Sequence, residues 1–306
     1  MTRVSDLAQH NLSQFNIQNT QQRLFETQVQ ISTGKVSSQY SGLGTDAGRL
    51  VSLENTRIRI DQYMKNIEIV DQRLQVMETD VSTIFELAST FRTLLINGLN
   101  VEGSSDLALN SAAQDILAQV AGFLNEQQDG RYLFAGTATN VPPVDLNAAG
   151  FTSPPPVYPS TANTAYFTAN STRLSVRVDD NLDVAYGVTA DETGFEQFIR
   201  SLKLASTANV GPPQDRNRLE EALRMVNESL KTIPLIITKI GAARRTLEEI
   251  SAKHSEFNLF TEEAIGKIEN VDVAVAITRL TTDQVTLEAS YLTIARLASL
   301  SLAQFL

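Results

Sequence analysis

The glycine-containing segments near the N-terminus are the residues whose spacing could bind a nucleotide. Residues 42–48 do not have the G-x-G-x-x-G spacing, and polar, helix-like sequence precedes them instead of a strand. Ser32-Thr33-Gly34-Lys35 is not a phosphate-binding loop either, because valines stand where the first glycine and the final Ser or Thr belong. We interpret Gly34 as the end of the first helix, with Lys35 beside the negative pole of that helix.

The remaining side chains that could do acid–base or metal chemistry do not form a set. The chain has no cysteine, and its two histidines, His10 and His254, lack the spacing of a zinc site. Asp179-Asp180 lies between strand-like runs and predicts a turn, whereas Glu248-Glu249 and Glu262-Glu263 are typical of solvated helix faces. We therefore predict no catalytic residue, metal or cofactor, and expect both histidines to be ordinary polar residues on helix faces.

Length and charge exclude several classes of partner. The chain has 306 residues, and 25 basic against 35 acidic residues give a net charge of −10. An acidic chain is repelled by nucleic acid and by an anionic membrane surface, and no apolar stretch is long enough to span a membrane. No secretory signal is recognisable in the first residues. From these features alone we expect a cytoplasmic protein of two or three domains.

The ends of the chain differ in composition from its middle. Residues 1–130 and 214–306 contain one proline, Pro234, whereas residues 137–213 contain the other eight. Helical ends should therefore flank an insert of strands and turns. The helices are expected at about 4–32, 53–95, 105–127, 214–260 with a kink at Pro234, and from 273 to the C-terminus.

Two apolar stripes have the spacing of a coiled-coil seam. Alternate steps of three and four from Leu53 to Leu95 meet twelve apolar residues in thirteen positions. A helix of that length spans about 65 Å. The same spacing runs from Val273 to Phe305 and, more weakly, through the N-terminal helix. We predict an assembly seam formed by Leu24, Ile31, Val273, Ile277, Leu280, Leu287, Tyr291, Ile294 and Phe305.

The stripes alone leave the architecture open, since an intramolecular bundle or a parallel coiled-coil dimer would also bury them. The two terminal helices favour an assembly. The first is too polar to be stable alone and the last too apolar to be covered by one neighbour. Copies that cover one another's end helices make heterologous contacts, which close into rings or propagate as helical tubes.

The segment Asp129-Gly130-Arg131-Tyr132-Leu133-Phe134-Ala135-Gly136 is the most specific of three that resemble a known family. It is similar to the motif after the second rod helix in the hook–filament junction proteins of the flagellin family, also called the hook-associated protein 3 family. Ile31-Ser32-Thr33-Gly34-Lys35 resembles the end of the family's first helix. The C-terminal pattern ends in Leu300-Ser301-Leu302-Ala303-Gln304-Phe305-Leu306. Residues 37–46 depart from the family, whose members often carry a D-D-P stretch there.

The resemblance implies a fold that is mainly α with a β-rich insert. N- and C-terminal helices would form a long, antiparallel, coiled-coil-like rod, as in flagellin. Terminal assembly helices are expected at 1–48 and 263–306, and a helical rod domain at 49–136 and 207–262. A β-rich outer domain is expected at 137–206.

The resemblance also implies a structural protein that joins the hook to the flagellin filament. Its partners would be copies of itself, a neighbouring hook-associated protein, flagellin and an export chaperone. Export through the flagellar type III apparatus without a cleaved signal would replace the cytoplasmic location. A flagellin filament subunit is the alternative, and an enzyme or ligand-binding domain within 140–205 is a third hypothesis.

Overall fold

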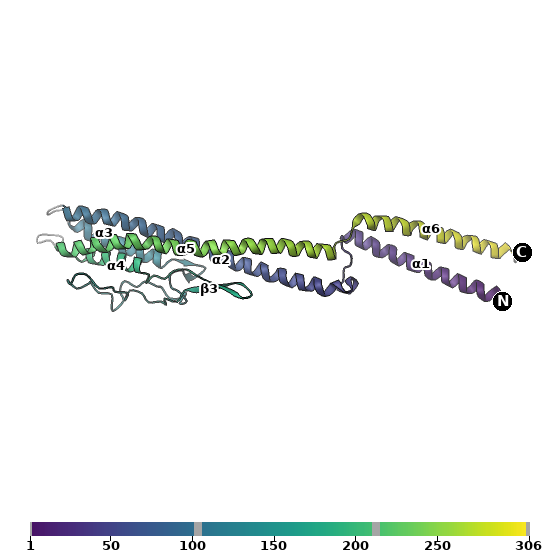
Figure 1. Cartoon of the computed structure of the whole chain (residues 1–306), viewed down its shortest axis with the longest axis horizontal. Helices are drawn as coiled ribbons and strands as arrows, with labels where there is room; N and C mark the ends of the chain where they lie inside the picture. Colours follow the sequence, from purple (N-terminus) through teal and green to yellow (C-terminus); the bar gives the residue numbers. More distant parts are fainter. Residues whose placement is uncertain (1, 101–105, 210–214, 304–306) are drawn as a thin grey trace. The chain divides into compact units, whose positions relative to one another are not determined.

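The computed structural model describes residues 2–100, 106–209 and 215–303 (Figure 1). The chain divides into two compact units, and each is described by itself. Unit 1 comprises Met1–Arg59 and Glu256–Leu306, and unit 2 comprises Ile60–Ser255. The elements in chain order are α1 (Thr2–Thr33), a 3-10 turn (Tyr40–Leu43), α2 (Asp46–Asn100), α3 (Asp106–Leu124), β1 (Gln127–Gln128), β2 (Arg131–Tyr132), β3 (Leu174–Asp179), β4 (Leu182–Tyr186), α4 (Thr193–Ser206), α5 (Arg216–Glu269) and α6 (Val273–Ala303).

The predicted helices are confirmed, and the fold is mainly α with a small β-containing insert. Pro234 lies inside α5, which continues to Glu269, so the kink at this residue stays a prediction. The sequence analysis missed α4, which lies within the segment expected to be strands and turns. In the described part of the insert, strand pairing is limited to the antiparallel β3–β4 hairpin and a single bridge between Val144 and Phe167.

Unit 2 has one continuous apolar core, and the stripe of α2 lies at its centre. From Ile67 to Leu95, every position of the predicted stripe is at most 4% exposed. These side chains join residues of α3, α4 and α5 in one cluster, in which the Phe91 and Phe198 rings lie 6.1 Å apart. The stripe is therefore buried inside the chain, as the intramolecular alternative predicts.

Helices α2 and α5 run antiparallel in unit 2. The guanidinium of Arg244 is 2.8 Å from a carboxylate oxygen of Asp71 and 2.8 Å from one of Glu78. Further along α2, Arg92 donates to the side chain of Asn227 at 2.8 Å. Residue numbers thus rise along α2 as they fall along α5, which confirms the antiparallel rod.

In unit 1, α1 and α6 lie side by side and antiparallel (Figure 1). Tyr291 accepts a hydrogen bond from Gln21 at 2.7 Å, and Arg23 pairs with Asp283 at 3.1 Å. A short antiparallel bridge closes the pair at its other end, where the backbone amide of Val271 donates to the carbonyl of Gly34 at 2.9 Å. The interface between the helices is narrow. Its buried or half-buried positions are Ser13, Ile17, Thr20, Leu24, Thr27 and Ile31 on α1, and Ala276, Leu280, Asp283, Leu287, Ser290 and Ile294 on α6.

Candidate functional site

The family-like motif begins as a tight hairpin after α3. Strands β1 and β2 pair antiparallel, and their two-residue turn is formed by Asp129 and Gly130. Both turn residues have positive φ, 53° and 71°, which is the backbone of a type I′ turn and explains the Asp-Gly sequence. Arg131 is exposed and Tyr132 is half-buried.

The second half of the motif fastens the start of the insert to the core. Phe134 is fully buried, its ring meets the ring of Phe195 edge-on at 6.1 Å, and its carbonyl accepts from the amide of Ala190 at 3.0 Å. Leu133 and Ala135 are also buried. The motif therefore contributes packing and chain direction, and we find no reacting group in it.

Gly136 is the motif residue whose identity the structure restricts most. Its φ is +58°, and a Cβ at this position would lie 2.0 Å from the carbonyl oxygen of Asn170 and 2.6 Å from that of Thr172. Real Cβ atoms do not approach backbone oxygens so closely, and positive φ already disfavours other residues. The insert backbone can pass this close to the motif only because position 136 has no side chain.

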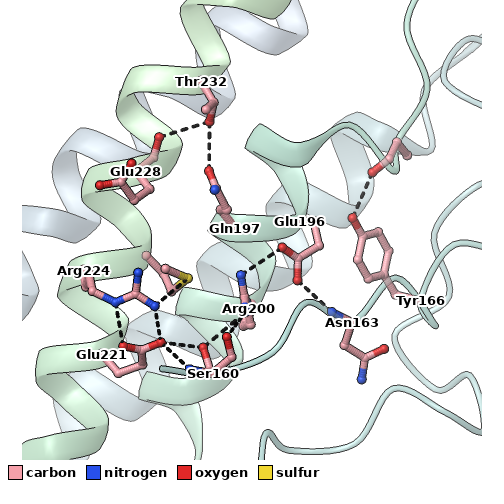
Figure 2. Close-up of polar contacts among 12 residues, drawn as sticks. Ser160, Asn163, Tyr166, Glu196, Gln197, Arg200, Glu221, Arg224, Glu228 and Thr232 are labelled. Carbon is pink, nitrogen blue, oxygen red and sulfur yellow. Dashed lines mark hydrogen bonds and ion pairs between the residues drawn. The ribbon is translucent and has the colours of Figure 1, made fainter. Parts of the chain in front are cut away.

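A buried polar network holds the middle of the insert against α4 and α5 (Figure 2). We call it the insert clamp, and it consists of Ser160, Glu196, Arg200, Glu221 and Arg224. Glu221 accepts from the amide and the hydroxyl of Ser160 at 2.7 and 2.6 Å, and Arg224 forms two bonds of 2.8 and 2.7 Å to the same carboxylate. Arg200 donates to the carbonyl of Ser160 at 2.6 Å and pairs with Glu196 at 3.2 Å.

The insert clamp contains a serine, carboxylates and arginines, as hydrolytic sites do, but it has no carboxylate that could act as general base for the serine. Burial alone would raise the pKa of Glu221, but the bonds from Arg224 and Ser160 lower it to about 2. A carboxylate with so low a pKa is a poor general base, so it cannot activate the Ser160 hydroxyl at neutral pH. Burial raises the pKa of Glu196 despite its bonds to Asn163 and Arg200. We interpret the clamp as structural.

His254 lies on helix α5, as expected, but it is buried, which the sequence analysis did not predict. The residue is 8% exposed, its Nε2 lies 2.6 Å from the carbonyl oxygen of Val178, and its ring stacks on Tyr63 at 5.8 Å. His254 thereby anchors β3 to the helices of unit 2. The spacing of α5 could have indicated burial, because Leu247, Ile250 and His254 follow one helix face. The side chain of His10 lies outside the described residues.

The end of the first helix at Gly34, the turn at Asp180 and the exposed acidic pairs lie where they were predicted, whereas Lys35 forms an ion pair with Glu269. Gly34 follows the last residue of α1 and has a φ of +71°, and the Lys35 ammonium lies 3.1 Å from a carboxylate oxygen of Glu269. Asp180 lies in the turn between β3 and β4. The carboxylates of Glu248, Glu249, Glu262 and Glu263 belong to exposed residues. No group of His, Asp and Glu residues that could hold a metal ion occurs among the described residues.

The predicted assembly seam divides between two faces of the terminal helices. Five members face the α1–α6 interface and are half-buried: Leu24, Ile31, Leu280, Leu287 and Ile294. Val273, Ile277 and Tyr291 are 45%, 49% and 48% exposed, and Phe305 lies outside the described residues. On α6 the smaller or more polar Ala276, Asp283 and Ser290 are buried or half-buried, whereas Ile277, Gln284 and Tyr291 are exposed, although the Tyr291 hydroxyl still contacts Gln21 of α1. The seam's role in assembly stays a prediction.

Exposed apolar side chains are concentrated in unit 1. Of the large apolar residues described as exposed, four lie in unit 2, namely Ile69, Val157, Leu182 and Leu235. Unit 1 contains the rest: Leu12, Phe15, Phe25, Val36, Tyr40, Val51, Ile58, Phe257, Leu259, Phe260, Val273, Val275, Ile277, Val285, Tyr291 and Leu292. Exposed apolar side chains concentrated in one unit are typical of a surface that a partner covers. Among the described helices, none is long and apolar enough to cross a membrane.

Comparisons with known proteins agree with this architecture. Residues 4–139 match the family of the bacterial flagellin N-terminal helical region. The chain is 21% identical over 320 residues to flagellar hook-associated protein 3 of Salmonella typhimurium, with 99% of both chains covered.

Solved structures give the same fold. The crystal structure of Bacillus cereus FlgL has a TM-score of 0.57 at 18% identity, over 70% of this chain and 99% of that one. The flagellar junction protein FlgL from Legionella pneumophila has a TM-score of 0.52 at 14% identity, over 71% of this chain and 98% of that one. At these identities the likeness shows a FlgL-like fold.

Proposed function

We propose that this chain belongs to the flagellin family, whose N-terminal helical region matches residues 4–139, and that it is a structural subunit of the bacterial flagellum that joins hook to filament. The choice of junction within the family rests on similarity over the full length to a hook-associated protein 3. The proposed activity is assembly, which requires no catalytic residue or cofactor.

The exposed apolar surface of unit 1 is the observation that carries the proposal. Buried apolar residues of unit 1 are few in its described part, namely Ile17, Leu50, Ile265 and Ala276, whereas the core cluster lies in unit 2. A unit with little core and much exposed apolar surface gains stability when neighbours cover it. If each copy covers the next by a heterologous contact, the subunits form a ring or a tube.

We propose that each part of the chain has its own role. The segments 1–48 and 263–306 contact neighbouring subunits in the assembly, the segments 49–136 and 207–262 form the helical rod domain, and the segment 137–206 faces outward. The proposed partners are further copies of this chain, a neighbouring hook-associated protein, flagellin, and a chaperone that covers the apolar ends before export. The assembled protein would then lie in the flagellum, outside the cell.

A flagellin filament subunit is the second candidate, since residues 4–139 match a region named for flagellins. Deleting the gene separates the two functions. Loss of a junction protein should leave hooks without filaments and release flagellin into the medium, as seen by electron microscopy and immunoblotting. Filaments that persist in altered or shortened form would favour flagellin. Normal filaments and motility would contradict both.

A further inference from the structure

A small cavity in unit 2 is lined by three arginines. Arg73 comes from α2, Arg131 from the motif hairpin, and Arg173 from the residue before β3. The volume of the cavity is about 20 Å³, and it opens to solvent. No Asp or Glu is among the described residues that line it, although the whole chain carries a net charge of −10. A positive site is therefore concentrated where the chain as a whole is acidic.

The arginines of this cavity have little compensation from the protein. The Nε of Arg73 is buried and has no hydrogen-bond partner among the described residues. Its guanidinium pairs with the carboxylate of Asp129 at 3.9 Å, and the Asp129 side chain is 71% exposed. Such an ion pair contributes little. Within the described part of the chain, neither Arg131 nor Arg173 forms an ion pair.

Four hydroxyl-bearing residues, Tyr132, Thr139, Tyr186 and Thr189, also line the cavity, together with apolar residues such as Met77, Leu133, Leu174 and Val188. A cavity that holds one water needs only about 10–15 Å³, so this one accepts a group of a few atoms and excludes a nucleotide. Guanidinium groups bind carboxylates in a planar, two-bond geometry, and hydroxyls can donate to the same oxygens. We propose that this cavity binds a single carboxylate group, either of a free small acid or of an acidic side chain on a protein partner.

The rest of the motif explains why the cavity would be kept open. Leu133 and Gly136 line it as well, and the backbone of Asn170 and Thr172 packs closely against Gly136, so this wall has little room to move. A rigid wall reduces the ordering cost of binding a small ligand. The site lies in unit 2, whereas the proposed assembly depends on the terminal segments of unit 1. The proposal of a carboxylate site and the proposal of an assembly function can therefore fail independently.

Isothermal titration of the purified full chain tests the site with two probes, sodium acetate and the capped peptide acetyl-Gly-Glu-Gly-amide, against sodium chloride at equal ionic strength. Saturable binding with one site per chain is expected, and it should weaken at least ten-fold in the double variant R131Q/R173Q. Both side chains belong to exposed residues, so thermal unfolding of this variant should match the parent.

The matched control is R216Q/R245Q, which removes the same charge from exposed positions of α5 and should bind like the parent. Similar affinity for both probes would identify a free acid as the ligand. Peptide binding at least ten-fold tighter would identify a protein side chain. Absence of saturable binding of both probes, or equal binding by parent and R131Q/R173Q, would overturn the proposal.

Discussion

The carboxylate of Glu221 on α5 accepts hydrogen bonds from both the amide and the hydroxyl of Ser160, 61 positions earlier in the chain. This contact closes the insert onto the helices at a point with no regular secondary structure. A buried carboxylate is tolerated here because Arg224 neutralises it and Ser160 supplies two donors. The insert is therefore held by specific polar contacts as well as by its apolar core.

We predict that Glu221→Gln destabilises unit 2 by about 2–4 kcal/mol at pH 7, because it leaves Arg224 without its partner and weakens both bonds from Ser160. Urea unfolding followed by circular dichroism measures the change. Glu220→Gln is the control, since Glu220 is exposed and pairs with the exposed Arg216. An equal, small effect of both substitutions would mean that the clamp does not hold the insert.

The effect of Glu221 should also depend on pH in a defined direction. Its pKa falls from an ordinary value of 4.5 to about 2 in the folded protein. The stabilisation is therefore fully present above about pH 4.5 and is lost as the pH falls toward 2. Parent and Glu221→Gln should differ most at neutral pH and converge near pH 2. If the difference in stability between parent and Glu221→Gln instead grew as the pH fell, the pKa of Glu221 could not be lowered in the folded protein.

Three glycines allow a graded test of the motif. Gly136→Ala places a Cβ 2.0 Å from a backbone oxygen at positive φ, and we expect a loss of more than about 3 kcal/mol. Gly130→Ala has the same strained φ but open space, so about 1–2 kcal/mol is expected. Gly122→Ala lies in α3 with nothing within 4 Å and should stabilise by up to about 1 kcal/mol. Urea midpoints in any other order would show that the close approach is not what restricts position 136.

Asp80 on α2 should make unit 2 less stable as the pH rises. Burial, with a smaller effect of the Glu126 charge, raises the pKa of Asp80 from 3.8 to about 7. Folding therefore favours the protonated form, and stability from this group is present below about pH 3.8 and lost as the pH rises to about 7. Asp80→Asn cannot ionise, so we expect it to be more stable than the parent at pH 8, by on the order of 2–3 kcal/mol, and similar at pH 4.

The measurement for Asp80 is the thermal midpoint of parent and variant at pH 4 and pH 8. Glu86→Gln on the exposed side of α2 is the control and should change little at either pH. A stabilisation by Asp80→Asn that is equal at both pH values would show that removal of the charge is not its cause.

The long helices and the core stripe could be predicted because apolar residues recur at steps of three and four over many turns. From Ile67 to Leu95 each position of the stripe is buried, and chance variation at single residues does not obscure such a repeat. Helix α4 was missed for the opposite reason. The prolines and threonines around it dominated the composition of the segment, although Phe195, Phe198, Ile199 and Leu202 have the spacing of one buried helix face.

The register of the terminal helices could not be predicted from apolar spacing alone. That analysis chose Ile277 and Tyr291, but Ala276 and Ser290 face α1. Side chains of α1 decide this, because Thr20 and Thr27 lie in the interface and donate to carbonyls of their own helix. A partly polar neighbour has little apolar surface to offer, so the larger residues of α6 remain exposed. The insert clamp could not be predicted either. Its Glu196–Arg200 and Glu221–Arg224 pairs are local, but nothing in the sequence shows that Ser160, 40 and 61 positions from Arg200 and Glu221, joins them.

The exposed side of α6 leads to the last prediction. At 100° per residue, Val285 and Leu292 lie opposite the face that α1 covers, and they are 60% and 62% exposed. Leu287→Asp with Ile294→Asp would also stop assembly, but these side chains face α1 and their loss disturbs the subunit itself.

Val285→Asp with Leu292→Asp should instead leave the monomer's helicity and thermal midpoint unchanged, because both positions are solvated in the monomer. In a strain that carries only this variant, we expect loss of filaments and of swimming, since two charges buried against a neighbour cost several kcal/mol. Val157→Asp with Leu182→Asp makes the same change at exposed positions of unit 2 and should swim. Normal filaments on the Val285 and Leu292 variant would mean that this face of α6 stays in water after assembly, and the proposed role of the terminal surface would be wrong there.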